Sequence, residues 1–68
     1  MPQYMITEND LRRALEQATV DLVEVGKYRI TYDPYLQLFR VFDGNREHYA
    51  GDSINKTTRE YNDLVTGR

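Results

Sequence analysis

His48 is the only histidine in the chain, and the chain has no cysteine. A metal site would therefore need His48 together with nearby carboxylates, which are those of Asp43, Glu47 and Asp52. Their spacing matches no zinc or calcium ligand pattern. We interpret His48 as an ordinary histidine at a strand edge, and we predict no metal ion and no cofactor.

The sequence also offers few candidate residues for nucleophilic or acid–base catalysis. Ser53 has only His48, five residues earlier, as a neighbouring base, and its position before a helical pattern predicts an N-cap. Carboxylate pairs such as Asp33 and Asp43 occur in a chain rich in solvated acids, and so small a domain offers no cleft of the glycosidase kind. We therefore predict no catalytic residues and no enzymatic activity.

The composition limits the classes of partner. We expect residues 1–68 to form a single domain.

The chain has eleven acidic and nine basic residues, for a formal charge of −2, and no block of like charge occurs. This balance disfavours a non-specific nucleic-acid binder, which normally carries a basic excess. The lack of cysteines and of an apolar N-terminal run predicts a cytoplasmic setting, and no apolar stretch approaches the ~18 residues that span a bilayer.

The centre of the chain predicts three short antiparallel strands within residues 28–50, separated by turn signals at 33–34 and 43–44. A loop over 33–36 would place Tyr32 opposite Gln37 and Ile30 opposite Phe39. The predicted inner face of the first two strands carries Tyr28, Ile30, Tyr32, Phe39 and Val41. The predicted outer face carries Arg29, Thr31, Leu38, Arg40 and Phe42. The third strand, residues 46–50, is short and polar, as is typical of an edge.

A helix is predicted on each side of these strands. Thr7 and Asp10 form a variant of the capping box, and a helical face of Leu11, Ala14, Leu15 and Ala18 follows. The end of this first helix is ambiguous. Residues 20–25 continue the helical spacing, which favours a helix to about Val23 or Val25, but they are also rich in β-branched residues. The alternative is a strand that turns at 26–27 into the next strand.

The second helix begins after Asp52 or Ser53 and runs to about Val65, and Gly67 ends it. The predicted fold class is thus a small α+β domain of order α-β-β-β-α, with a three-stranded antiparallel sheet and both helices on one face. The core is predicted to contain Leu11, Leu15, Ile30, Phe39, Val41, Tyr61 and Leu64.

The outer face is the most distinctive feature of the predicted fold. Aromatic residues and arginine are enriched in interface hot spots. The predicted partner-binding residues are Arg29, Thr31, Leu38, Arg40 and Phe42. We interpret the chain as a non-enzymatic interaction module, an inhibitor or a regulator, which docks through this face on a protein partner or on a second copy as a homodimer. The other interpretation is that residues 4–6 cover this face.

A sheet of three strands followed by one helix, residues 28–65, resembles the layout of AP2-type and integrase arm-binding domains. That resemblance implies a sheet placed in the major groove of DNA, with Arg29 and Arg40 as readers, aided by Lys27 and Arg46. The excess of acidic over basic residues, together with the apolar side chains of Leu38 and Phe42, makes nucleic acid the less favoured partner. In size and in lack of motifs the chain is also similar to small acidic phage proteins, including inhibitors of host defence.

Overall fold

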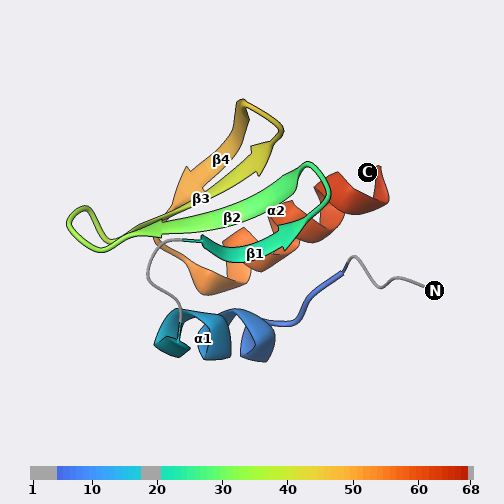
Figure 1. The fold of residues 1–68 in the computed structure, drawn as a ribbon. Helices are drawn as coiled ribbons and strands as arrows, with labels where there is room; N and C mark the ends of the chain where they lie inside the picture. Colours follow the sequence, from blue (N-terminus) through green and yellow to red (C-terminus); the bar gives the residue numbers. More distant parts are fainter. Residues whose placement is uncertain (1–4, 18–20, 68) are drawn as a thin grey trace.

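The computed structural model describes residues 5–17 and 21–67, which form a small α+β fold of two helices and one antiparallel sheet (Figure 1). Strands that are consecutive in the sequence are neighbours in the sheet, in the order β1-β2-β3-β4. The elements are α1 (Glu8–Gln17), β1 (Asp21–Val25), β2 (Tyr28–Asp33), β3 (Leu38–Asp43), β4 (Arg46–Gly51) and α2 (Ile54–Thr66). The predicted order α-β-β-β-α is therefore wrong by one strand, because β1 precedes the three that were predicted.

The N-terminus of α1 is fixed by the predicted capping box. The Thr7 hydroxyl accepts a hydrogen bond from the Asp10 amide at 3.2 Å, and the Asp10 carboxylate accepts one from the Thr7 amide at 3.0 Å. Two of the amides that a helix start leaves without partners are thereby satisfied. Leu11, in the first turn, is the buried residue of this helix.

Strand β1 corrects the prediction that the first helix runs to Val23 or Val25. Val23 and Val25 pair with β2, and Gly26, at φ 61°, allows a two-residue turn. An irregularity in the pairing between Asp21 and Val23 lets Leu22 and Val23 both pack against the core. The strand preference of the β-branched residues thus decides the conformation of this segment, and the helical spacing of its apolar residues does not. Residues 18–20, which include the predicted helix position Ala18, lie outside the described residues.

The β2–β3 hairpin has a register two residues away from the predicted one. Asp33 lies opposite Leu38 and Tyr32 opposite Phe39, so the loop is 34–37 and not 33–36. The Asp33 carboxylate accepts hydrogen bonds from two loop amides, which starts the turn one residue later than predicted. Gln37 has a φ of 55° and therefore belongs to the turn. The predicted faces survive, because side chains alternate with a period of two.

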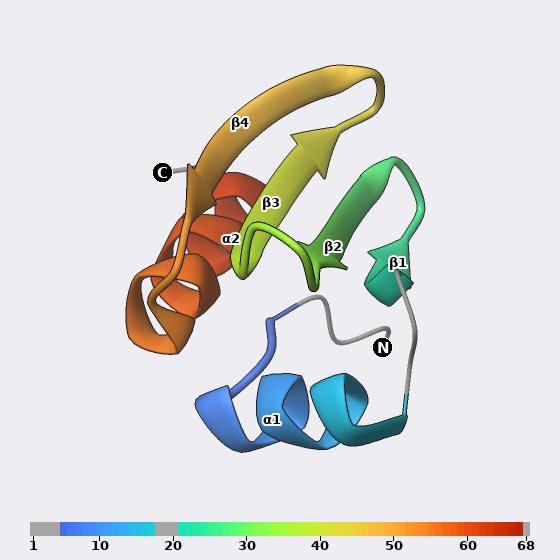
Figure 2. The same ribbon diagram turned by 90° about the vertical axis from the view of Figure 1, so that its left-hand side faces the viewer.

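The core lies between one face of the sheet and both helices. Its buried apolar residues are Leu11, Ile30, Phe39, Val41 and Tyr61, and the predicted core residues Leu15 and Leu64 pack against them while partly exposed. Helix α2 contacts β3 and β4, and α1 contacts β1 and α2 (Figures 1 and 2). The prediction that both helices lie on one face of the sheet is confirmed, and we call this the inner face.

Helix α2 begins and ends as predicted. The Ser53 hydroxyl accepts a hydrogen bond from the Lys56 amide, and Gly67 adopts a left-handed conformation, at φ 79°, just beyond the last turn. Strand β4 lies at the sheet edge, as predicted, with an irregularity in its pairing opposite Val41 and Phe42.

Candidate functional site

The face of the sheet opposite the helices carries the five residues predicted to bind a partner. Arg29 lies opposite Phe42, and Thr31 lies opposite Arg40, while Leu38 ends the same row. All five are half-buried, and none belongs to the core cluster of the described residues. We call this surface of Arg29, Thr31, Leu38, Arg40 and Phe42 the outer face. The structure therefore brings the predicted residues together on one surface, away from the helices.

The N-terminal residues do not supply the predicted cover, as far as they are described. The Ile6 amide donates to the Asn62 side chain at 2.8 Å, and the Asn62 amide group donates back to the Ile6 carbonyl at 2.9 Å. Ile6 also packs against the core cluster. It is thus held at α2, on the inner side of the sheet, while Tyr4 lies outside the described residues.

Arg40 is held at the middle of the outer face by two carboxylates. Its guanidinium lies 3.2 Å from Glu47 of β4 and 3.7 Å from Asp33 of β2. Both partners come from strands that flank β3, so Arg40 crosses the sheet surface and does not extend into solvent. Its charge is balanced locally, which lowers its value for contacting phosphate.

Arg29 is arranged differently. Its guanidinium carbon lies 4.7 Å from the centre of the Phe42 ring, which is cation–π geometry. The cross-strand neighbour of Arg29 on its other side is Glu24 of β1. The ring and the stem of Arg29 therefore present an apolar patch, with one cation and one acid at its border.

The residues predicted to bind a partner did not include the acidic residues of this surface. Asp33 could have been included from the alternation along β2, since it is two residues beyond Thr31. Glu47 could not, because the irregular pairing in β4 decides that it lies opposite Phe42. Glu24 was missed because β1 was predicted as helix. These acids change the outer face from basic to mixed in charge.

The residues considered for catalysis have structural partners. His48 Nε2 lies 3.4 Å from the Glu60 carboxylate of α2, and Ser53 caps that helix. Asp33 and Asp43 lie at opposite ends of the hairpin, where Asp33 pairs with Arg40 and Asp43 lies 3.3 Å from Lys27. The hairpin thus separates the two carboxylates that were weighed as an acid–base pair.

A metal site requires several ligand side chains to lie close together. Among residues 5–17 and 21–67, no three His, Asp or Glu side chains gather closely enough to hold an ion.

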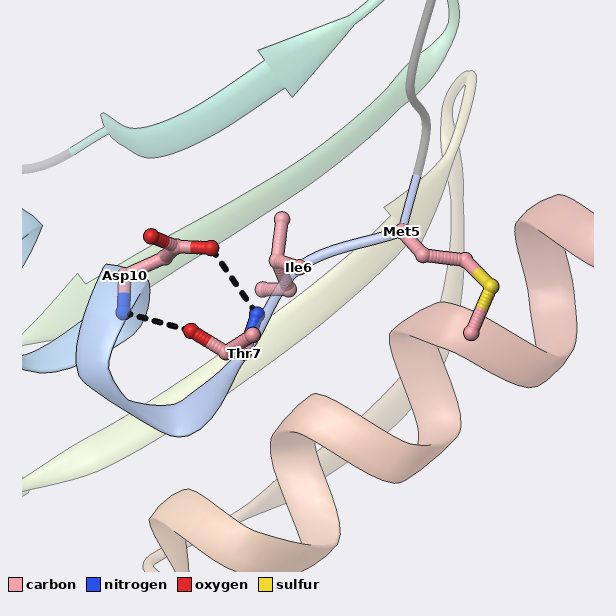
Figure 3. A pocket seen from close by; sticks show the side chains of 4 residues that line it. All are labelled: Met5, Ile6, Thr7 and Asp10. Carbon is pink, nitrogen blue, oxygen red and sulfur yellow. Dashed lines mark hydrogen bonds between the residues drawn. The ribbon is translucent and has the colours of Figure 1, made fainter.

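A surface pocket lies beside the start of α1 and is lined by Met5, Ile6, Thr7 and Asp10 (Figure 3). Its polar atoms are those of the capping box, and they bond to each other. The hydrogen bonds from the Thr7 amide and hydroxyl, together with the charge of Arg13, lower the pKa of Asp10. The Asp10 carboxylate already has hydrogen-bond partners within the cap. We therefore interpret this pocket as part of the helix cap and not as a binding site.

A second, smaller hollow of about 250 Å³ lies at the base of the β2–β3 loop. Its lining residues are Thr31, Tyr32, Asp33, Pro34 and Arg40. Three of these, Thr31, Asp33 and Arg40, belong to the outer face or to its acidic border, so the hollow lies at that end of the surface.

No protein-family model, curated protein or solved structure matches this chain. No helix in the described ranges is long and apolar enough to cross a membrane.

Proposed function

We propose that this chain is a non-enzymatic protein-docking module that binds a protein surface through its outer face. The observation that carries the proposal is the placement of Leu38 and Phe42, two large apolar side chains, on the sheet face opposite the core cluster, which neither of them joins. Such a patch, bordered by polar groups, is typical of an interaction site. The partner surface should offer apolar contacts to Leu38 and Phe42, with polar or charged groups facing Arg40 between them.

The electrostatics of the outer face favour protein over DNA. Arg40 is paired with two carboxylates, and Arg29 lies between the Phe42 ring and Glu24. A sheet that reads the major groove needs cations free to contact phosphates and base edges. Here the acids would face the phosphate backbone and repel it. Specific binding of duplex DNA would therefore contradict the proposal.

Two charge-introducing variants test the proposal. Leu38→Glu and Phe42→Glu each place a carboxylate on an apolar part of the docking surface, where it would have to be desolvated. Gln17→Glu adds the same charge at an exposed position of α1 and is the matched control. Proteins that crosslink to the wild type are identified and purified, and their dissociation constants are then measured against all four proteins.

The expected result is binding that Leu38→Glu and Phe42→Glu weaken at least tenfold and that Gln17→Glu leaves unchanged. Circular dichroism melts show whether each variant is folded. If either outer-face variant unfolds the protein, that face belongs to the core and the proposal is wrong. Tight binding of random duplex DNA that falls steeply with added salt would also overturn it, in favour of the DNA-reading alternative.

A further inference from the structure

The three hairpin turns of the sheet differ in a way that points to a second binding element. Gly26 and Gly44 open two-residue turns of small and polar residues. The β2–β3 turn has four residues, 34–37, and we call it the hairpin tip. It carries Tyr35, which is 96% exposed, and Leu36, which is 59% exposed. Two adjacent large side chains so open to water offer contact area to another molecule, and tyrosine is enriched at interfaces because its ring is apolar and its hydroxyl is polar.

The hairpin tip is held in one conformation before any contact is made. The Asp33 Oδ1 atom accepts hydrogen bonds from the Tyr35 amide at 2.9 Å and from the Leu36 amide at 3.2 Å. Arg40 holds the other carboxylate oxygen, and Pro34 restricts the backbone at the start of the turn. A fixed loop loses little conformational entropy on binding, so its contacts contribute more fully to affinity.

The hollow at the base of the same hairpin suits a tyrosine side chain. Pro34 and Tyr32 supply apolar surface, and the Arg40 guanidinium can lie against an aromatic ring. The Asp33 carboxylate, at the rim, can accept a hydrogen bond from a phenol. Since Arg40 and Asp33 already pair with each other, a neutral aromatic group fits there better than an ion.

We propose that the occupant of the hollow is Tyr35 of a second copy of this chain. One hairpin carries both the exposed tip and the hollow, so two hairpins related by a two-fold axis can exchange contacts, each tip entering the other's hollow. This is the self-complementary arrangement that a two-fold dimer requires. The inference rests on the proposed docking function, whose partner it names, because the hollow forms one end of the outer face.

The first test is self-association of the wild-type chain. Sedimentation velocity from about 10 μM to about 1 mM spans the affinities expected of a small interface. We expect a monomer–dimer equilibrium that Tyr35→Ala weakens at least tenfold. Tyr35 is exposed, so this variant should fold as the wild type does. Asn45→Ala, in the turn between β3 and β4, is the control and should leave the equilibrium unchanged.

The second test uses the symmetry of the proposed contact. Thr31→Glu fills the hollow and leaves the tip intact, whereas Tyr35→Ala removes the tip and leaves the hollow intact. Each variant alone should be monomeric, because both of its contacts are lost. An equal mixture should associate measurably, because one tip–hollow contact is restored. No recovery on mixing would overturn the exchange geometry.

Isotope-filtered NMR gives a direct readout. With one copy labelled and one unlabelled, we expect contacts between the Tyr35 ring of one and the Thr31 methyl group of the other. A chain that remains monomeric to about 1 mM would overturn the inference. If it is monomeric but captures another protein in a manner that Phe42→Glu abolishes, the docking function stands without a second copy. If both experiments are negative, both proposals are wrong.

Discussion

The two faces of the sheet come from the same central strands and differ in what lies against them. On the inner face, Ile30 and Val41 are cross-strand partners and are fully buried under the helices. One residue along each strand, Arg29 and Phe42 are also partners, but they lie on the opposite side of the sheet and outside the core cluster. Burial separates a face that determines stability from one that is free to bind. We therefore expect the same substitution to lower the free energy of unfolding more on the inner face than on the outer face.

The largest effect is expected from a matched pair on β3. Phe39→Ala removes a ring that is 3% exposed and should lower the free energy of unfolding by about 3–5 kcal/mol. A loss of that size can unfold a domain with ~5 kcal/mol of stability. Phe42→Ala removes the same ring from the outer face, where it loses mainly its contact with Arg29, and should cost about 1 kcal/mol.

Urea unfolding of both variants measures this difference. Two equal losses would mean that the outer face is as much a core as the inner one, and the distinction between the faces would fail. A larger loss for Phe42→Ala would reverse the assignment altogether.

A smaller loss of stability is expected from a substitution at Gly51, where β4 ends. A Cβ atom added at Gly51 would meet the Tyr49 side chain, coming within 2.8 Å of its Cζ atom, on the inner side of the strand. Gly51→Ala should therefore destabilise the protein by about 1–3 kcal/mol through overpacking. Ala50 is exposed on the other side, and Ala50→Ser should have little effect.

The cause can be isolated with a double-mutant cycle. In a Tyr49→Ala background the obstacle is gone, so Gly51→Ala should lose most of its cost. If the cost persists without Tyr49, the backbone and not the side chain requires glycine there.

The two faces could be predicted from the sequence because alternation is insensitive to a register error of two. Phe39 and Val41 stay inside, and Leu38 and Arg40 stay outside, with either loop. The loop itself depends on the Asp33 side chain, which bonds to the next amides and delays the turn. A local hydrogen bond of this kind is compatible with several turn lengths, so the sequence left the register open.

Strand β1 could not be predicted with the same ease. Leu22 and Val25 satisfy the spacing of a helix face as well as the pattern of a half-buried strand, and only pairing with β2 decides between them. The charge pattern of the outer face depends on the same distant pairings. Glu24 reaches it through β1, and Glu47 through the irregular register of β4. The five predicted residues and Asp33 could therefore be placed from strand alternation, whereas Glu24 and Glu47 could not.

A still smaller effect is expected from Tyr61, which lies in the layer over the inner face. Its ring is fully buried, and its hydroxyl has no hydrogen-bond partner among the described residues. Burial, and to a lesser degree the nearby Tyr28, raises the pKa of this phenol. Tyr61→Phe removes an unpaired polar atom and keeps the ring, so it should leave stability unchanged or raise it by up to about 1 kcal/mol.

Tyr35→Phe is the control, because the same atom is removed from a side chain in water. Thermal melts of both variants give the answer. A loss above ~1 kcal/mol for Tyr61→Phe would show that its hydroxyl makes a hydrogen bond in solution.

The smallest effect concerns the cap that fixes α1 beside the inner face. The pKa of Asp10 is lowered mainly by the hydrogen bond from the Thr7 amide, then by the Thr7 hydroxyl and by Arg13. A carboxyl whose pKa is lower in the folded state stabilises the fold when it is ionised. That contribution is complete above the unfolded value, near 3.8, and is lost as the pH falls through the folded pKa. Asp10→Asn keeps an acceptor and removes the charge, so the melting temperatures of wild type and variant should differ at pH 7 and converge as the pH falls below 3.8 and through the folded pKa of Asp10. The outer-face acids are common to both proteins and cancel in the difference. A constant difference at every pH would assign the effect to hydrogen-bond geometry and not to the charge of Asp10.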